Sequence, residues 1–124
     1  MKYEALTFTI PEVAGISKET MENHLTLYAG YVKHVNLIRE KITAYSNDYE
    51  NNSYAIAEMQ RRLGFEFGGM RNHEYFFTQF EGGPKPLPDG RLKEKIEFQW
   101  GSFDKWLQRF KQIASTRGVG WAML

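Results

Sequence analysis

The sequence of 124 residues contains no cysteine. Disulfides and thiolate metal sites are therefore excluded, and any bound metal must use nitrogen and oxygen ligands. An excess of one charge is also lacking, because 16 Lys and Arg residues stand against 15 Asp and Glu residues. This balance gives no electrostatic reason to expect nucleic acid or a membrane surface as a partner. No apolar run has the length of a signal-peptide core or of a transmembrane helix, so we expect a cytoplasmic protein.

Two long stretches, 18–45 and 53–80, have apolar residues at every third or fourth position. This period predicts two amphipathic helices, and Ser17 is the expected N-cap of the first one. The polar segment YSNDYENNSY, residues 45–54, separates the two stretches. The sequence therefore predicts a long antiparallel helical hairpin that follows an extended arm at residues 1–16.

Three glycines, Gly64, Gly68 and Gly69, lie inside the second of these stretches. A glycine in a helix interior costs roughly 1 kcal/mol relative to alanine. Such a cluster predicts either a break in the helix or a close approach of another backbone.

The segment EGGPKPLPDGR, residues 81–91, is rich in proline and glycine and predicts a linker between two domains. A short helix is expected at 92–98, and Ser102 is expected to cap another helix. The apolar segment GVGWAML, residues 118–124, reads as a buried strand. The predicted fold class is mainly α, with a hairpin domain at 1–80 and an incomplete α+β domain at 92–124.

Two histidines lie almost symmetrically about the polar turn. His24 is about 25 residues before the middle of the turn, and His73 is about 24 residues after it. At about 1.5 Å of rise per residue, each lies roughly 36 Å from the tip, so facing helices bring them to the same level. Two imidazoles inside a helical hairpin form half of a metal site. From the residues alone, a pair of hydrogen-bonded core histidines is the other interpretation, and His34, which has no matching partner, is expected at the surface.

Three segments resemble the iron/manganese superoxide dismutases, in the order in which that family has them. ISKETMENH at 16–24 resembles the helix of the first metal ligand, and GGMRNHEYFF at 68–77 resembles the helix of the second. GSFDKWLQRFKQIASTRGVGWAML at 101–124 is similar to the family's helix and first strand. The resemblance implies superoxide as the substrate, iron or manganese as the cofactor with one ion per complete subunit, and a homodimer in the complete protein.

Site residues follow from the resemblance at matching positions. It implies that His24 and His73 are metal ligands and that Trp121 lines the active-site cavity. Tyr31 matches the gateway tyrosine that hydrogen-bonds solvent and substrate, one residue nearer to the first ligand than is usual. Tyr28 stands where the family often has a second histidine.

Gly69 stands where many iron enzymes of the family have a glutamine and many manganese enzymes have a glycine. It favours the manganese arrangement but does not decide the metal, because several surrounding groups tune the potential together.

The family's other two ligands are an aspartate and a histidine in a motif like DxWEHAY, which nothing in this sequence matches. We therefore expect the N-terminal two-thirds of a dismutase, truncated before the C-terminal ligands and with little or no activity alone. Two alternatives remain: a non-catalytic helical scaffold or oligomerisation protein derived from the same fold, and a site that partner chains complete.

Overall fold

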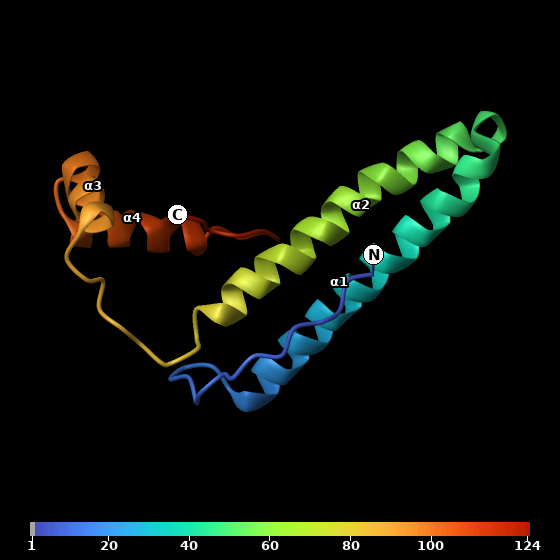
Figure 1. Cartoon of the computed structure of the whole chain (residues 1–124). Helices are drawn as coiled ribbons and strands as arrows, with labels where there is room; N and C mark the ends of the chain where they lie inside the picture. Colours follow the sequence, from blue (N-terminus) through green and yellow to red (C-terminus); the bar gives the residue numbers. More distant parts are fainter. Residues whose placement is uncertain (1) are drawn as a thin grey trace. The chain divides into compact units, whose positions relative to one another are not determined.

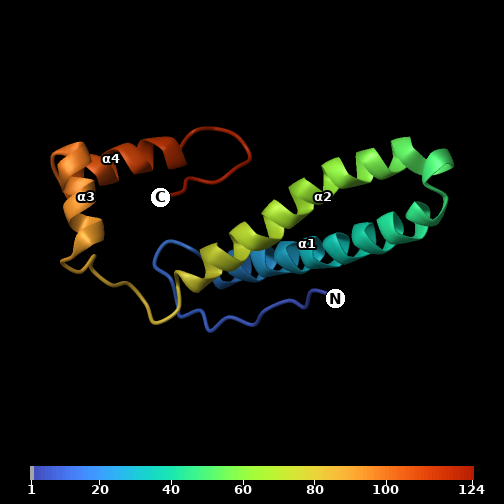
Figure 2. The same cartoon turned by 45° about the horizontal axis from the view of Figure 1, so that its top comes forward.

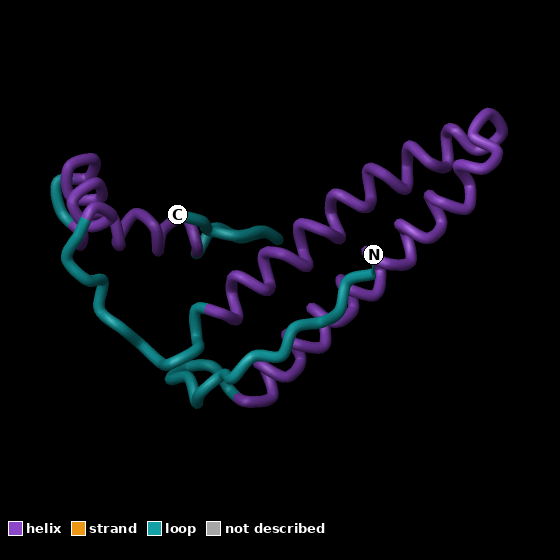
Figure 3. Tube along the Cα trace, in the orientation of Figure 1, coloured by secondary structure: helices purple, strands orange, loops and turns teal. Residues whose placement is uncertain are grey.

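The computed structural model describes residues 2–124, and these are mainly helical (Figures 1 and 3). The chain forms two compact units, Met1–Gly83 and Pro84–Leu124, and the division falls inside the segment predicted to be a linker. The elements in chain order are α1 (Lys18–Tyr45), the 3-10 turn η1 (Ser46–Asp48), α2 (Tyr49–Thr78), α3 (Arg91–Trp100) and α4 (Phe103–Ala114).

The first unit is the predicted hairpin, in which α1 and α2 run side by side in opposite directions (Figure 2). α1 begins as expected, because the Ser17 hydroxyl accepts a hydrogen bond from the Thr20 N–H at 3.1 Å. α2 begins at Tyr49, earlier than the predicted residue 53. Part of the polar segment is therefore itself helical and the turn is short. The Asn52 side chain donates to the Asp48 carbonyl at 2.8 Å.

The core of the hairpin lies between the two helices and under the N-terminal arm. The arm follows one side of the hairpin (Figure 2), and Asn36 binds it by accepting from the Tyr3 N–H and donating to the Tyr3 carbonyl, both at 2.8 Å. Phe8 of the arm packs against Tyr28 and Phe77. The buried cluster consists of Met21, Tyr28, Val32, Val35, Met70 and Phe77.

The glycine cluster does not break α2, which is continuous from Tyr49 to Thr78. The predicted break is therefore wrong. A close approach does occur at Gly69, but a side chain makes it: a Cβ at Gly69 would meet Cε1 of Tyr31 at a distance that no real Cβ adopts. Gly64 and Gly68 have open space where a Cβ would be.

The second unit contains α3 and α4. α3 ends at Trp100 and is capped by Gly101, whose φ of 80° is the left-handed conformation that glycine adopts readily. Ser102 caps α4 as predicted, accepting from the Lys105 N–H at 3.2 Å. The strand predicted at 118–124 is not formed, because a strand requires a neighbour and no described segment pairs with these residues. Among the described helices, none is both long and apolar enough to cross a bilayer.

Candidate metal centre

His24 of α1 and His73 of α2 face each other across the hairpin. Their ring centroids are 4.7 Å apart, and the ring planes cross at 77°. His73 is only 5% exposed, whereas His24 is half-buried. The symmetric spacing about the turn predicted that these two residues would meet, and the structure confirms this juxtaposition.

A backbone carbonyl fixes the tautomer of His73. Its Nδ1 lies 2.6 Å from the carbonyl oxygen of Gly69, one helical turn earlier. Because a carbonyl oxygen only accepts hydrogen bonds, Nδ1 must carry the proton. The lone pair of the neutral ring is then on Nε2, which is the arrangement that a metal-binding histidine needs.

The surroundings favour the neutral form of His24. Burial lowers the pKa of His24, and the neighbouring His73 lowers it further. Both effects act in the same direction, because a buried positive charge loses hydration and two imidazolium ions would repel each other. A neutral imidazole is the form that binds a metal ion.

Aromatic side chains surround the pair. Tyr31 lies 5.1 Å from the His73 ring, between centroids, and its ring occupies the space above Gly69. Phe76 and Phe77 lie 5.0 and 5.2 Å from the His24 ring. The Tyr31 side chain is thus next to the pair, and its role as a gateway residue stays a prediction.

The two remaining residues with a predicted place are Trp121 and His34. Trp121 belongs to the unit Pro84–Leu124, so its place in an active-site cavity stays a prediction. His34 is at the surface, as expected, with a side chain that is 52% exposed and an Nδ1 that lies 3.6 Å from the Glu66 carboxylate.

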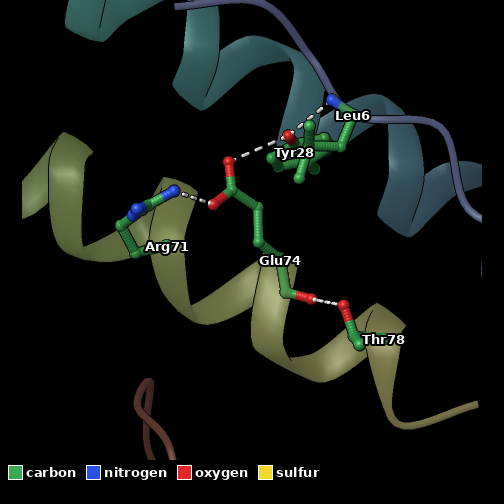
Figure 4. A network of polar contacts seen from close by, with 5 residues as sticks. All are labelled: Leu6, Tyr28, Arg71, Glu74 and Thr78. Atoms are coloured by element: carbon green, nitrogen blue, oxygen red, sulfur yellow. Dashed lines mark hydrogen bonds and ion pairs between the residues drawn. The ribbon is translucent and has the colours of Figure 1, made fainter.

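Sequence reasoning missed a buried polar network beside the pair (Figure 4). Glu74, the residue after His73, is 8% exposed and points toward Tyr28 of α1. Its carboxylate accepts hydrogen bonds from the Tyr28 hydroxyl at 3.1 Å and from Arg71 at 2.5 Å. The signal was present in the sequence, since Arg71 and Glu74 are three residues apart on one helix face. The partner on the other helix could not be read from that spacing.

The donors of the pair fit part of an iron or manganese site. Two neutral imidazole nitrogens at one level of the hairpin are suitable ligands for such ions. Within residues 2–124, no group of three or more His, Cys, Asp or Glu side chains is arranged to hold a metal ion. The pair is the contribution that the described residues make to such a site.

Comparison with known proteins gives the same family for both units. Residues 2–81 match the α-hairpin domain of the iron/manganese superoxide dismutases, and residues 88–124 match their C-terminal domain. The manganese superoxide dismutase of Mycobacterium lepraemurium is 35% identical over 126 residues, covering 98% of this chain and 56% of that protein.

Relatives that differ in their metal are about equally similar. The iron enzyme of Saccharolobus solfataricus is 33% identical over 116 residues, covering 88% of this chain and 54% of that protein. The manganese/iron enzyme of Porphyromonas gingivalis is 32% identical over 114 residues, covering 88% and 56%. The chain spans about half the length of the curated relatives that it matches. With both of its units matched, the chain belongs to the iron/manganese superoxide dismutase family.

Proposed function

We propose that this chain provides His24 and His73 as two protein ligands of a mononuclear iron or manganese ion in a superoxide dismutase. The observation that carries the proposal is the pair itself, with ring centroids 4.7 Å apart and with the proton of His73 held on Nδ1 by Gly69. Family membership supports the same function. For the complete protein we propose a homodimer with one metal ion per subunit.

A redox-active ion, when bound, supplies the one-electron exchange that converts superoxide into dioxygen and hydrogen peroxide. The residues of this chain have supporting tasks. The two imidazoles bind as neutral ligands, and the Gly69 carbonyl keeps the second of them in the required tautomer. Phe76 and Phe77 limit the access of water to His24, and the Tyr31 hydroxyl is the proposed hydrogen-bonding group for solvent and substrate.

Residues 1–124 on their own should have little or no dismutase activity. Two neutral imidazoles leave a divalent or trivalent ion with its full charge, and the aspartate expected from the family's motif would reduce that charge. The pair also supplies only half of the four protein ligands. Trp121 is proposed to line the cavity when the remaining ligands are present.

The test compares the 124-residue chain with a fusion in which the C-terminal segment of the Mycobacterium lepraemurium enzyme follows Leu124. Iron and manganese content is measured together with superoxide consumption. We expect activity in the fusion and a loss of at least a hundredfold in its His24→Ala and His73→Ala variants, whereas His34→Ala serves as the control and keeps activity.

Family-level activity in the 124-residue chain alone would contradict the proposed need for further ligands. A well-folded fusion that takes up neither metal would contradict the assignment of the histidine pair and favour a non-catalytic scaffold.

A further inference from the structure

The Tyr28 hydroxyl joins three segments of the hairpin unit (Figure 4). It accepts a hydrogen bond from the Leu6 N–H of the arm at 2.9 Å and donates one to Oε1 of Glu74 at 3.1 Å. Tyr28 is 2% exposed. Its hydroxyl is therefore held in place from both sides, and the ring has little freedom to tilt.

The Glu74 side chain is buried, which is rare for a carboxylate. Charged side chains are almost never buried without a partner, so the groups that bind this carboxylate matter. Arg71 binds Oε2 and orients the carboxylate, so that Oε1 faces Tyr28. The Thr78 hydroxyl also donates to the Glu74 carbonyl at 2.7 Å. The side chain of Arg71 is 47% exposed, so solvent still reaches the positive end of this network.

The Tyr28 ring contacts the histidine pair directly and through a neighbour. It stacks on His73 with centroids 6.4 Å apart and planes 29° apart. It also packs edge-on against Phe77 at 6.1 Å, and Phe77 in turn lies 5.2 Å from the His24 ring. Burial raises the pKa of Tyr28, so its hydroxyl keeps the proton that it donates to Glu74.

We propose that Glu74 is a positioning residue for the histidine pair, acting through the Tyr28 hydroxyl on the ring that packs against His73. What the pair binds rests on the proposed function, but the positioning itself concerns the metal-free chain. When the Tyr28 ring is held, the His73 ring keeps the orientation in which its Nδ1–H reaches the Gly69 carbonyl. Without the Glu74 acceptor, the Tyr28 ring and then the His73 ring gain freedom.

A purely structural role would make a different prediction. The Tyr28 hydroxyl also anchors the arm, so its loss could act only by loosening residues near Leu6. Asn36 anchors the same arm through two hydrogen bonds to Tyr3. The rings that pack against the histidine pair belong to other residues, Tyr28, Tyr31, Phe76 and Phe77. Asn36→Ala is therefore the matched control, because it loosens the arm without removing the support of the Tyr28 ring.

The experiment compares the original 124-residue chain with four variants that each carry one substitution: Glu74→Leu, Glu74→Gln, Tyr28→Phe and Asn36→Ala. The first readout is the ¹⁵N NMR spectrum of the His73 ring in the metal-free chain, which reports the tautomer. The second is the affinity for Co²⁺, measured from its visible spectrum. Glu74→Gln is the conservative variant, because its one amide oxygen can still accept from Tyr28 when the half-exposed Arg71 side chain turns away from the amide N–H₂ group.

We expect Glu74→Leu and Tyr28→Phe to convert His73 from the Nδ1–H tautomer to a mixture of tautomers and to weaken Co²⁺ binding by about tenfold, the lower end of what the loss of a supporting group costs. Glu74→Gln should retain most of both properties, and Asn36→Ala should leave the tautomer of His73 and the Co²⁺ affinity unchanged. If Glu74→Leu and Tyr28→Phe, both folded, keep the original tautomer, the proposal is wrong. An equal shift in Asn36→Ala would overturn it as well.

The two readouts separate this proposal from the proposed function. If the original chain binds no Co²⁺ at the pair but the tautomer shifts as expected, the positioning role stands, and the two histidines do not hold a metal ion without the remaining ligands. If Co²⁺ binds equally in all five proteins and the tautomer is constant, the metal assignment stands and the positioning role fails. Should Glu74→Leu not fold, Tyr28→Phe decides, because it keeps the ring and removes only the hydroxyl.

Discussion

The hairpin unit and the second unit are both built from amphipathic helices, but their interiors differ. α4 has an apolar face made of Phe103, Trp106, Leu107 and Phe110, yet none of its 12 residues is buried. In the hairpin unit, Val35, Met70 and Phe77 are completely buried. Of the buried hydrophobic residues in the described chain, only Ile96 belongs to the second unit.

An apolar stripe thus determines which face of a helix can be buried, whereas a facing segment determines whether that face is buried. In the hairpin, α1, α2 and the arm cover one another along Met21–Val35 of α1 and along Ile56–Phe77 of α2, where the buried residues of the two helices lie. The residues of the candidate site also lie in the better-packed unit. His24, His73, Tyr31 and Glu74 lie in the unit with the core, where packing holds side chains in fixed positions.

The largest expected effect comes from comparing one residue type between the two units. Phe77→Ala removes a fully buried ring from the hairpin core and should lower its free energy of unfolding by about 3–5 kcal/mol. Phe98→Ala in α3, where the side chain is 86% exposed, should change the free energy of unfolding of the chain by less than about 0.5 kcal/mol. Urea unfolding followed by circular dichroism measures both, and equal effects would contradict the difference between the two interiors.

Adjacent glycines in α2 allow a sharper test within one helix. Gly69→Ala places a Cβ against the Tyr31 ring, and overpacking of this kind costs about 1–3 kcal/mol, against a gain of about 1 kcal/mol in helix propensity. Gly68→Ala meets nothing within 4 Å, so it should stabilise the hairpin by up to about 1 kcal/mol. Opposite signs in thermal unfolding support the close packing at Tyr31, whereas two stabilised variants would refute it.

Because Tyr28 is buried, we expect the free energy of unfolding of the hairpin unit to depend on pH in the alkaline range. Burial raises the pKa of Tyr28 in the folded state above the ordinary value of 10.0. Stability is then fully present below pH 10.0, the unfolded value, and falls above it, because the unfolded chain releases the proton first. The extra slope is at most about 1.4 kcal/mol per pH unit. Unfolding measured from pH 8.5 to 11 should be steeper for the original chain than for Tyr28→Phe, and parallel curves would count against a buried, protonated phenol.

The smallest expected effects come from the helix caps. Ser17→Ala and Ser102→Ala each remove one hydrogen bond, of 3.1 and 3.2 Å, from the start of α1 and of α4. Each should cost about 1 kcal/mol. Because α4 has no buried face, the loss should appear there as fraying, whereas α1 is held by its packing. Hydrogen exchange of the first turn measures this, and fraying of α1 to the same extent would weaken the comparison.

Much of the fold was predictable because periodicity and capping are local signals. The bounds of α1, the cap at Ser17 and the cap at Ser102 follow from residues that are near in sequence. The earlier start of α2 was missed because no residue of this helix before Ile56 is buried, so residues 49–52 carry no apolar period. The strand at 118–124 was expected from composition, but strand formation depends on a distant partner that composition does not describe.

The site was partly predictable for a related reason. His24 and His73 are nearly equidistant from the turn, so the geometry of two antiparallel helices predicted that they meet. The bond between Tyr28 and Glu74 joins two helices across 46 residues of sequence, and its register depends on how the helices pack. The same holds for Gly69. Its need to lack a Cβ depends on the position of the Tyr31 ring, which belongs to the other helix.

Mn²⁺ titration followed by NMR shows whether His24 and His73 together bind a metal ion. Paramagnetic Mn²⁺ broadens the signals of nearby nuclei in the 124-residue chain. We predict that the ring signals of His24 and His73 broaden first and together, and that His24→Ala abolishes the broadening at His73. Broadening that begins at exposed carboxylates, with both rings unaffected, would contradict the account.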